Sequence, residues 1–155
     1  MIILQDTREK KPWDFTFHGF DQETFGLKTG DYSVKGCEHL VRIERKRSTG
    51  EIATNFGFKR KQFEAELERM MDFKYRYVLC EFPEEYIDMF PDKSGIPYAI
   101  RRKVRISAGF IKASIQSLSV KYGVDFLFAR SILEAEEMAI EIFTRVVDEH
   151  TKNAS

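Results

Sequence analysis

The 155-residue sequence has few cysteines and no long apolar run. It contains only Cys37 and Cys80, far apart in the chain. A domain of this size can bury a sizeable core without covalent staples, so we expect both thiols to be reduced. No apolar run is long enough to span a bilayer, and residues 2–4 are too short an apolar segment for a signal sequence. These absences predict a cytoplasmic or nuclear protein that makes no membrane contact.

The sequence also lacks a net charge, because 25 Lys and Arg residues balance 25 Asp and Glu residues. Nucleic-acid binding must therefore come from local basic patches rather than from an overall positive field. The three histidines have no partner at zinc-ligand spacing, so we predict no zinc. Internal repeats and low-complexity tracts are absent as well. We expect a single domain over residues 1–150 and a disordered tail over residues 151–155.

Patterns typical of strands and helices alternate along the chain. Short apolar or β-branched runs predict strands over 2–5, 32–34, 40–44, 75–82 and 124–129. Helical spacing predicts helices over 59–72, 107–122 and 131–149. Residues 10–29 show no clean period, so we expect a loop-rich segment there. Residues 84–104 hold two prolines and a glycine, so we expect an exposed connection with room for a helical turn. The alternation predicts an α/β fold with a central, partly parallel sheet and helices on its faces.

The segment Glu44-Arg45-Lys46 carries the strongest chemical signal. Side chains alternate between the two faces of a strand, so Glu44 and Lys46 should share one face while Arg45 points to the other. If Asp31 ends a neighbouring strand on that face, two carboxylates and an ammonium group converge. This arrangement can hold a divalent cation beside a phosphodiester.

Simpler explanations exist for each of these residues taken alone. A charged tripeptide such as Glu44-Arg45-Lys46 is usually an exposed strand end. Asp6 and Asp31 could be turn residues that bond nearby backbone amides. Only the order of these residues along the chain favours a catalytic site.

Three blocks in order resemble the signature of the XPF/Mus/Hef structure-specific endonucleases, within the PD-(D/E)XK superfamily. They are Asp6-Thr7-Arg8-Glu9, Gly30-Asp31 and Glu44-Arg45-Lys46. The resemblance extends over most of the chain and implies a restriction-endonuclease-like mixed sheet flanked by helices. The family signature usually has a further Asp where this sequence has Gly50, followed by Glu51.

The resemblance implies a role for each motif residue. Asp31 and Glu44 would hold Mg²⁺ or Mn²⁺, and Asp6 would bind the metal or position a water. Lys46 would orient the attacking hydroxide or stabilise charge in the transition state. We expect Arg8 to bind a phosphate through two hydrogen bonds, and Glu9 to orient Arg8 or Lys46 or to join the metal ligands. Glu51 either replaces the missing Asp or is an ordinary helix N-terminal carboxylate.

Basic residues along the chain predict contacts with DNA phosphates, although solvated surfaces would explain them too. The predicted DNA-binding residues are Arg45, Arg47, Lys59, Arg60, Lys61, Arg101, Arg102, Lys103 and Arg105.

The resemblance favours a metal-dependent endonuclease that cuts DNA at flaps, forks or other branches during repair, recombination or replication. We expect a stand-alone nuclease domain, as in a viral, plasmid-encoded or prokaryotic enzyme. The alternatives are a non-catalytic DNA-binding or scaffold subunit of a nuclease complex, a junction resolvase, or an exonuclease of the same superfamily. A homodimer or heterodimer could pair through the late helices at Ile111, Ile115, Ile142 and Val146, although burial against the sheet explains these residues equally well.

Overall fold

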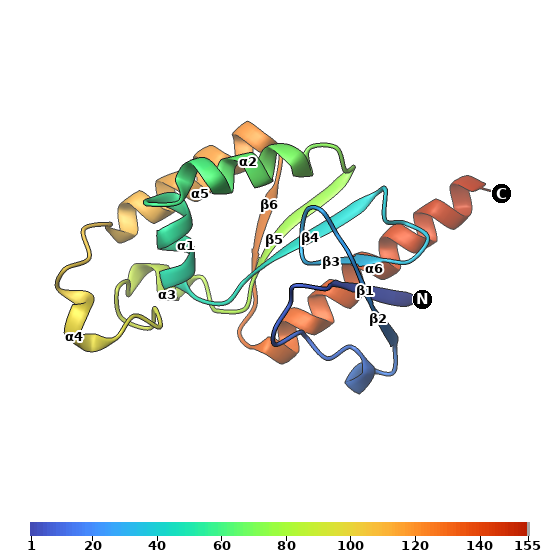
Figure 1. Ribbon diagram of the computed structural model, residues 1–155, viewed down its shortest axis with the longest axis horizontal. Coiled ribbons are helices and arrows are strands. Elements are labelled where there is room, and N and C mark those ends of the chain that lie inside the picture. Colours follow the sequence, from blue (N-terminus) through green and yellow to red (C-terminus); the bar gives the residue numbers. More distant parts are fainter. Residues whose placement is uncertain (155) are drawn as a thin grey trace.

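The computed structural model describes residues 1–154 and contains a six-stranded sheet (Figure 1). Its strands are β1 (Ile2–Asp6), β2 (Asp21–Phe25), β3 (Tyr32–Val34), β4 (Val41–Lys46), β5 (Tyr75–Cys80) and β6 (Asp125–Phe128). Their order in the sheet is β2-β1-β3-β4-β5-β6. Strand β3 is antiparallel to β1 and β4, and the other neighbouring pairs are parallel. The predicted mixed α/β sheet is confirmed.

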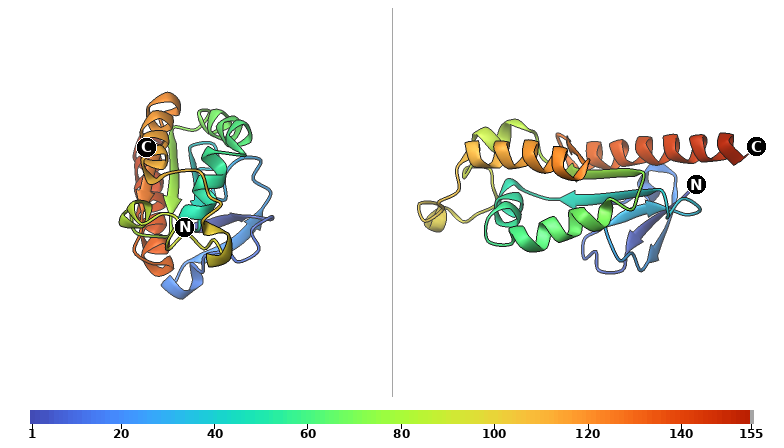
Figure 2. Two further views of the ribbon diagram at one scale, coloured as in Figure 1. Left: turned by 90° about the vertical axis from the view of Figure 1, so that its left-hand side faces the viewer. Right: turned by 90° about the horizontal axis from the view of Figure 1, so that it is seen from above.

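Helices pack on both faces of this sheet. One face is covered by α6 (Ile132–Ala154), and the other by α1 (Thr49–Phe56), α2 (Arg60–Met70) and α5 (Ala108–Tyr122). Figure 2 shows α6 along one side of the strands and α1 and α2 on the opposite side. Shorter elements are η1 (Thr16–His18), α3 (Glu85–Asp88) and α4 (Tyr98–Arg101). None of the helices within residues 1–154 is both long and apolar enough to cross a membrane.

The alternation of β4 assigns its side chains to two different environments. Val41 and Ile43 are buried in the core beneath α6. On the opposite face, the Lys46 Nζ lies 4.9 Å from the ring centroid of Phe63 in α2. The charged residues at even positions of β4 therefore lie beneath α2, in the region that forms the candidate site.

Local capping signals set the ends of two predicted helices. The Ser107 hydroxyl accepts a hydrogen bond from Phe110 N at 3.1 Å, which begins α5, and Gly123 ends it in a left-handed conformation with φ of 60°. Ser131 likewise accepts from Glu134 N at the start of α6. The predicted helices at these positions are confirmed.

The structure departs from the sequence-based expectations in three segments. The loop predicted over 10–29 contains β2, an almost fully exposed edge strand without an apolar pattern. Helix α1 was not predicted. Residues 151–154 continue α6 rather than forming a disordered tail, and Ser155 lies outside the described residues. Cys37 and Cys80 are both buried free thiols, as expected.

Candidate active site

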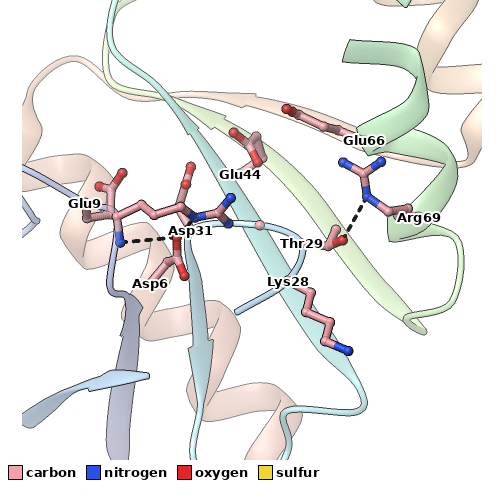
Figure 3. Close-up of a pocket in the computed structure, with 10 residues that line it drawn as sticks. Asp6, Glu9, Lys28, Thr29, Asp31, Glu44, Glu66 and Arg69 are labelled. Atoms are coloured by element: carbon pink, nitrogen blue, oxygen red, sulfur yellow. Dashed lines mark hydrogen bonds and ion pairs between the residues drawn. The ribbon is translucent and has the colours of Figure 1, made fainter. Parts of the chain in front are cut away.

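Asp31 and Glu44 lie side by side where β3 meets β4. The Asp31 amide donates to Ile43 O at 2.8 Å, and its carboxylate Oδ2 accepts from Arg45 N at 2.8 Å. These two bonds hold the Asp31 side chain against β4, the strand from which Glu44 projects (Figure 3). The predicted convergence of these two carboxylates is present in the structure.

Both carboxyl groups are disfavoured as anions in this position. Burial raises the pKa of Asp31 to about 6, although the Arg45 amide opposes the shift. Burial also raises the pKa of Glu44 well above its ordinary value, and the neighbouring Asp31 carboxylate raises it further. Two like charges in a poorly solvated place repel each other, so the pair is suited to hold a cation between its oxygens.

Lys46 supplies the positive charge of the cluster. Its Nζ lies 3.6 Å from Glu44 Oε1, and only 6% of the residue is exposed. Burial alone lowers the pKa of Lys46, but the carboxylates of Glu44 and Glu51 outweigh it, so the pKa lies above its ordinary value. A lysine in this state is charged and cannot act as a base, which favours an electrostatic role over proton abstraction.

Asp6, at the end of β1, has a partner for each carboxylate oxygen. Oδ1 accepts from Leu27 N at 2.9 Å, and Oδ2 accepts from Arg8 Nε at 2.5 Å. Asp6 therefore fixes the loop that precedes Gly30. Arg8 also donates from Nη2 to Leu27 O at 2.9 Å, so the guanidinium edge expected to bind a phosphate twice is already occupied. Its side chain is nevertheless 70% exposed beside the site.

Arg45 and Glu9 belong to a buried network on the opposite face of β4. Arg45 donates to Glu81, to Glu9 Oε2 at 3.1 Å and to Lys11 O at 2.6 Å. Its guanidinium also lies 5.0 Å from the ring centroid of Trp13. The prediction that Arg45 faces away from Glu44 and Lys46 is correct, whereas its assignment to DNA binding is wrong because these partners surround it.

Glu9 bonds to neither of the two basic residues that it was expected to orient. Its Oε2 accepts from the Tyr32 hydroxyl at 3.0 Å and from Arg45, and neither Arg8 nor Lys46 bonds to it. The predicted orienting role of Glu9 is therefore wrong for both basic residues. Glu9 also lines the cavities that contain Asp31 and Glu44, so the alternative that it joins the metal ligands stays a prediction.

Residues 50 and 51 explain the departure from the family motif. Gly50 donates its amide to Ser94 O at 3.1 Å, and a Cβ at position 50 would lie 2.5 Å from that oxygen. No aspartate fits there without moving the backbone of the 94–96 segment. Glu51 accepts from Arg47 N at 3.0 Å, as a helix N-terminal carboxylate does, and also lines a cavity together with Glu44 and Lys46.

Asp31 and Glu44 are the residues of this cavity that could hold a metal as a pair. Within residues 1–154, no group of three or more His, Cys, Asp or Glu side chains is close enough to hold a metal ion. Mg²⁺ keeps several of its waters and is commonly bound through one or two carboxylates. Because the two carboxylates repel each other and lie in an open cavity of about 260 Å³, they fit such an ion.

Comparisons with known proteins give a match at the level of structure alone. No family model and no curated protein matches the sequence. XPF from Aeropyrum pernix superposes with a TM-score of 0.69 at 18% identity, over 99% of this chain and 68% of that chain. The fold is that of XPF. XPF from Aeropyrum pernix in a complex with DNA gives a TM-score of 0.67 at 18% identity, over 96% of this chain and 65% of that chain.

The resemblance predicted from the three sequence blocks is thus confirmed as a shared fold. The chain spans about two thirds of the length of these XPF chains. In this chain, the XPF fold brings Asp31, Glu44 and Lys46 together and leaves Arg45 behind the sheet.

The predicted DNA-binding residues lie in separate places on this XPF fold. Arg47 is exposed and lines the cavity that contains Glu44. Lys59 and Lys61 line a second depression beside Phe58, and Arg60 between them bonds to Glu64 and Ser114. The remaining residues lie in and after α4, at the far end of the molecule (Figure 1); they are Arg101, which pairs with Asp92, and the exposed Arg102, Lys103 and Arg105.

Sequence reasoning missed three charged residues that line the same cavity as the carboxylate pair. They are Lys28 on the loop before β3, and Glu66 and Arg69 on α2. Arg69 Nε donates to Thr29 Oγ1 at 3.3 Å, which links the end of α2 to that loop. Nothing in their sequence spacing from Glu44 identifies them, because α2 reaches the site only through tertiary packing.

Proposed function

We propose that this protein is a Mg²⁺- or Mn²⁺-dependent endonuclease that hydrolyses phosphodiester bonds in DNA. The observation that carries the proposal is the Asp31 and Glu44 carboxylate pair with the Lys46 ammonium 3.6 Å from Glu44. The pair lies in an open cavity edged by exposed basic residues, as a site for a phosphodiester requires. The shared fold with an XPF that is known in a complex with DNA supports the same substrate class.

Each residue of the cluster has a defined task in this reaction. Asp31 and Glu44 would hold the divalent ion. When bound, Mg²⁺ neutralises charge on the phosphate and makes a water more acidic. Lys46 stays protonated and stabilises the negative charge that develops on the phosphate oxygens as the attacking water approaches. Arg8, half of whose guanidinium is fixed by Asp6 and Leu27, offers its remaining nitrogen to an adjacent phosphate.

The preferred substrate in this proposal is branched DNA, such as a flap or a fork. Phosphate contacts position DNA without reading sequence, so an enzyme that relies on them selects by shape and flexibility. The basic residues near α4 and at the start of α2 lie apart from the cavity and would contact a second arm of such a substrate.

The test is cleavage of end-labelled flap, fork, four-way junction and linear duplex DNA with Mg²⁺, Mn²⁺ or EDTA. We expect cutting near the branch with either metal and none with EDTA. Asp31→Asn and Lys46→Ala should each lower the rate at least about a hundredfold, because each removes a group that acts on the transition state.

The control variants are Asp21→Asn and Lys35→Ala, which make the same changes at exposed positions on the sheet edge and beyond β3. Both should cut at the wild-type rate. Absence of cleavage in every combination of DNA and metal would refute the proposal, and full activity of Asp31→Asn would refute the assigned metal site.

A further inference from the structure

Three adjoining cavities with shared lining residues lie around the carboxylate pair. The cavity that holds Asp31 and Glu44 shares these residues with a neighbouring cavity of about 250 Å³, which extends to Lys46 and Arg47. In the other direction it shares Lys28, Thr29 and Arg69 with a third cavity of about 410 Å³. These three adjoining cavities are called the groove below, and the candidate metal ligands line the middle one.

The groove follows strand β4. Arg42, Glu44 and Lys46 alternate onto the same face of this strand: Arg42 lines the third cavity, Lys46 the second, and Glu44 both the first and the second. At about 3.3 Å per residue, the floor from Arg42 to Lys46 is about 13 Å long. A single DNA strand lying in the groove would therefore place one phosphodiester at Glu44 and its neighbouring nucleotide toward Arg42.

The third cavity is lined by an aromatic residue, Phe73, which packs against the buried Arg42. The Arg42 guanidinium lies 4.2 Å from the ring centroid of Phe73 and is itself buried. It donates to Thr29 O at 2.8 Å and to Ser33 Oγ at 3.1 Å. Arg42 thus packs on the Phe73 ring, and both residues line the cavity. The aromatic surface is positioned before any ligand arrives.

Two exposed cations stand at the boundary between this cavity and the carboxylate pair. Lys28 lies on the loop before β3 and Arg69 lies on α2, where its Nε faces Thr29 (Figure 3), and both residues line this cavity as well as the one that contains Asp31 and Glu44. The bond from Arg69 Nε to Thr29 Oγ1 fixes this orientation. Their position suits a phosphate group that enters the groove next to the reacting bond.

We infer that the cavity formed by Gly26, Lys28, Arg69, Asp72 and Phe73 is a binding subsite for one unpaired nucleotide of the DNA strand that is cut. Its base lies on Phe73 and its phosphate between Lys28 and Arg69. Stacking on an aromatic ring accepts any base, and the volume admits a single nucleotide rather than a base pair. The location of the subsite rests on the proposed nuclease function, which it deepens by requiring that the strand be single on this side of the cut.

The test measures DNA binding in EDTA, where no cleavage occurs. Fluorescence anisotropy compares a labelled oligothymidylate with an abasic oligomer of the same length, which keeps the phosphates and lacks the bases. The wild-type protein should prefer oligothymidylate by about tenfold, as one stacked base gives. Phe73→Leu should bind both oligomers alike, since it loses the ring and keeps apolar bulk beneath Arg42.

A second variant separates the phosphate contact from stacking. Lys28→Ala should bind both oligomers about fivefold more weakly, keep the preference for bases, and lower the slope of log affinity against log salt by about 0.7. Lys35→Ala, an exposed lysine at the opposite end of β3, should bind as wild type.

The subsite is refuted if wild-type protein shows no preference for bases, if Phe73→Leu retains that preference while folded, or if Lys28→Ala binds like Lys35→Ala. These outcomes do not depend on cleavage. If the protein cuts branched DNA but gives one of these contradicting binding results, the nuclease function stands and the subsite is refuted. If the binding results are as expected but no DNA is cut, the nuclease function alone is refuted.

Discussion

Three consecutive residues of β4 divide between the candidate site and a buried structural network. Glu44 and Lys46 face the groove, while Arg45 lies behind the sheet between Glu81 and Glu9. The Arg45 side chain is 5% exposed, so its charge is compensated by these two carboxylates rather than by water. A residue that a motif places in a catalytic signature thus acts here as a buried structural cation.

The first prediction tests that structural role. Arg45→Met keeps the length of the side chain but leaves Glu9 and Glu81 buried without their cation, so it should lower the free energy of unfolding by about 3 kcal/mol or more. Denaturant unfolding followed by circular dichroism measures the change. Arg47→Met, a change at an exposed arginine two residues later, should alter stability by less than about 0.5 kcal/mol. Equal unfolding midpoints for the two variants would contradict the role.

At the scale of elements, contact between α2 and α5 sets the wall of the groove. Glu64 on α2 accepts hydrogen bonds from the Tyr122 hydroxyl at 2.7 Å and from Lys121 Nζ at 3.0 Å, both at the end of α5. Its other oxygen accepts from Arg60 Nε at 3.0 Å. The bonds from Tyr122 and Lys121 lower the pKa of Glu64 to about 2. This carboxylate therefore links the two helices as an anion.

The second prediction follows from the sign of this shift. Because the pKa of Glu64 is lower in the folded state, its stabilisation is present above about pH 4.5 and is lost as the pH falls toward 2. Glu64→Gln should melt below wild type at pH 7, and the difference should narrow as the pH falls from 5 to 2. Thermal melts across this range measure it. A constant gap, or one equal to that of the exposed Glu68→Gln, would contradict the prediction.

Elements with strong local signals could be predicted from the sequence, and those without them could not. Helix α5 has an apolar face, a Ser107 cap and Gly123 at its end, so its bounds agree with the prediction. Helix α1 has only eight residues, and the alternative of Glu51 as a helix N-terminal carboxylate was not extended to a predicted helix. Strand β2 is an exposed edge strand, which needs no apolar alternation and therefore shows none.

The residues of the candidate site also differ in whether the sequence could predict them. Glu44 and Lys46 could be placed on one face because the period of a strand fixes it. Asp31, which precedes β3, was assigned to the site through the resemblance that the three sequence blocks carry. Lys28, Arg69 and Phe73 come from a loop, a helix end and a turn that meet only in the folded chain. The dimer contact suggested from the sequence is not available to three of its four residues. Ile111, Ile142 and Val146 are buried in the core of their own chain and cannot contact a second one.

At the scale of the whole molecule, the fold brings two mutually repelling carboxylates, Asp31 and Glu44, together at one site. The chain has no net charge, yet its sheet order brings two carboxylates together at the centre of a groove with Arg8, Lys28, Arg47 and Arg69 along its edges. Mutual repulsion at this centre costs stability in the metal-free protein, and a divalent cation would remove that cost. Metal binding should therefore stabilise the entire fold.

The most direct test of the proposed metal site is the melting temperature with and without Mg²⁺, compared between wild type and Glu44→Gln. At about ten times its Kd, Mg²⁺ contributes about 1.4 kcal/mol, which should raise the wild-type Tm by about 3–6 °C. Glu44→Gln should show no rise, and Glu137→Gln, an exposed change on α6, should respond as wild type. An unchanged wild-type Tm, or an equal rise in Glu44→Gln, would contradict the account.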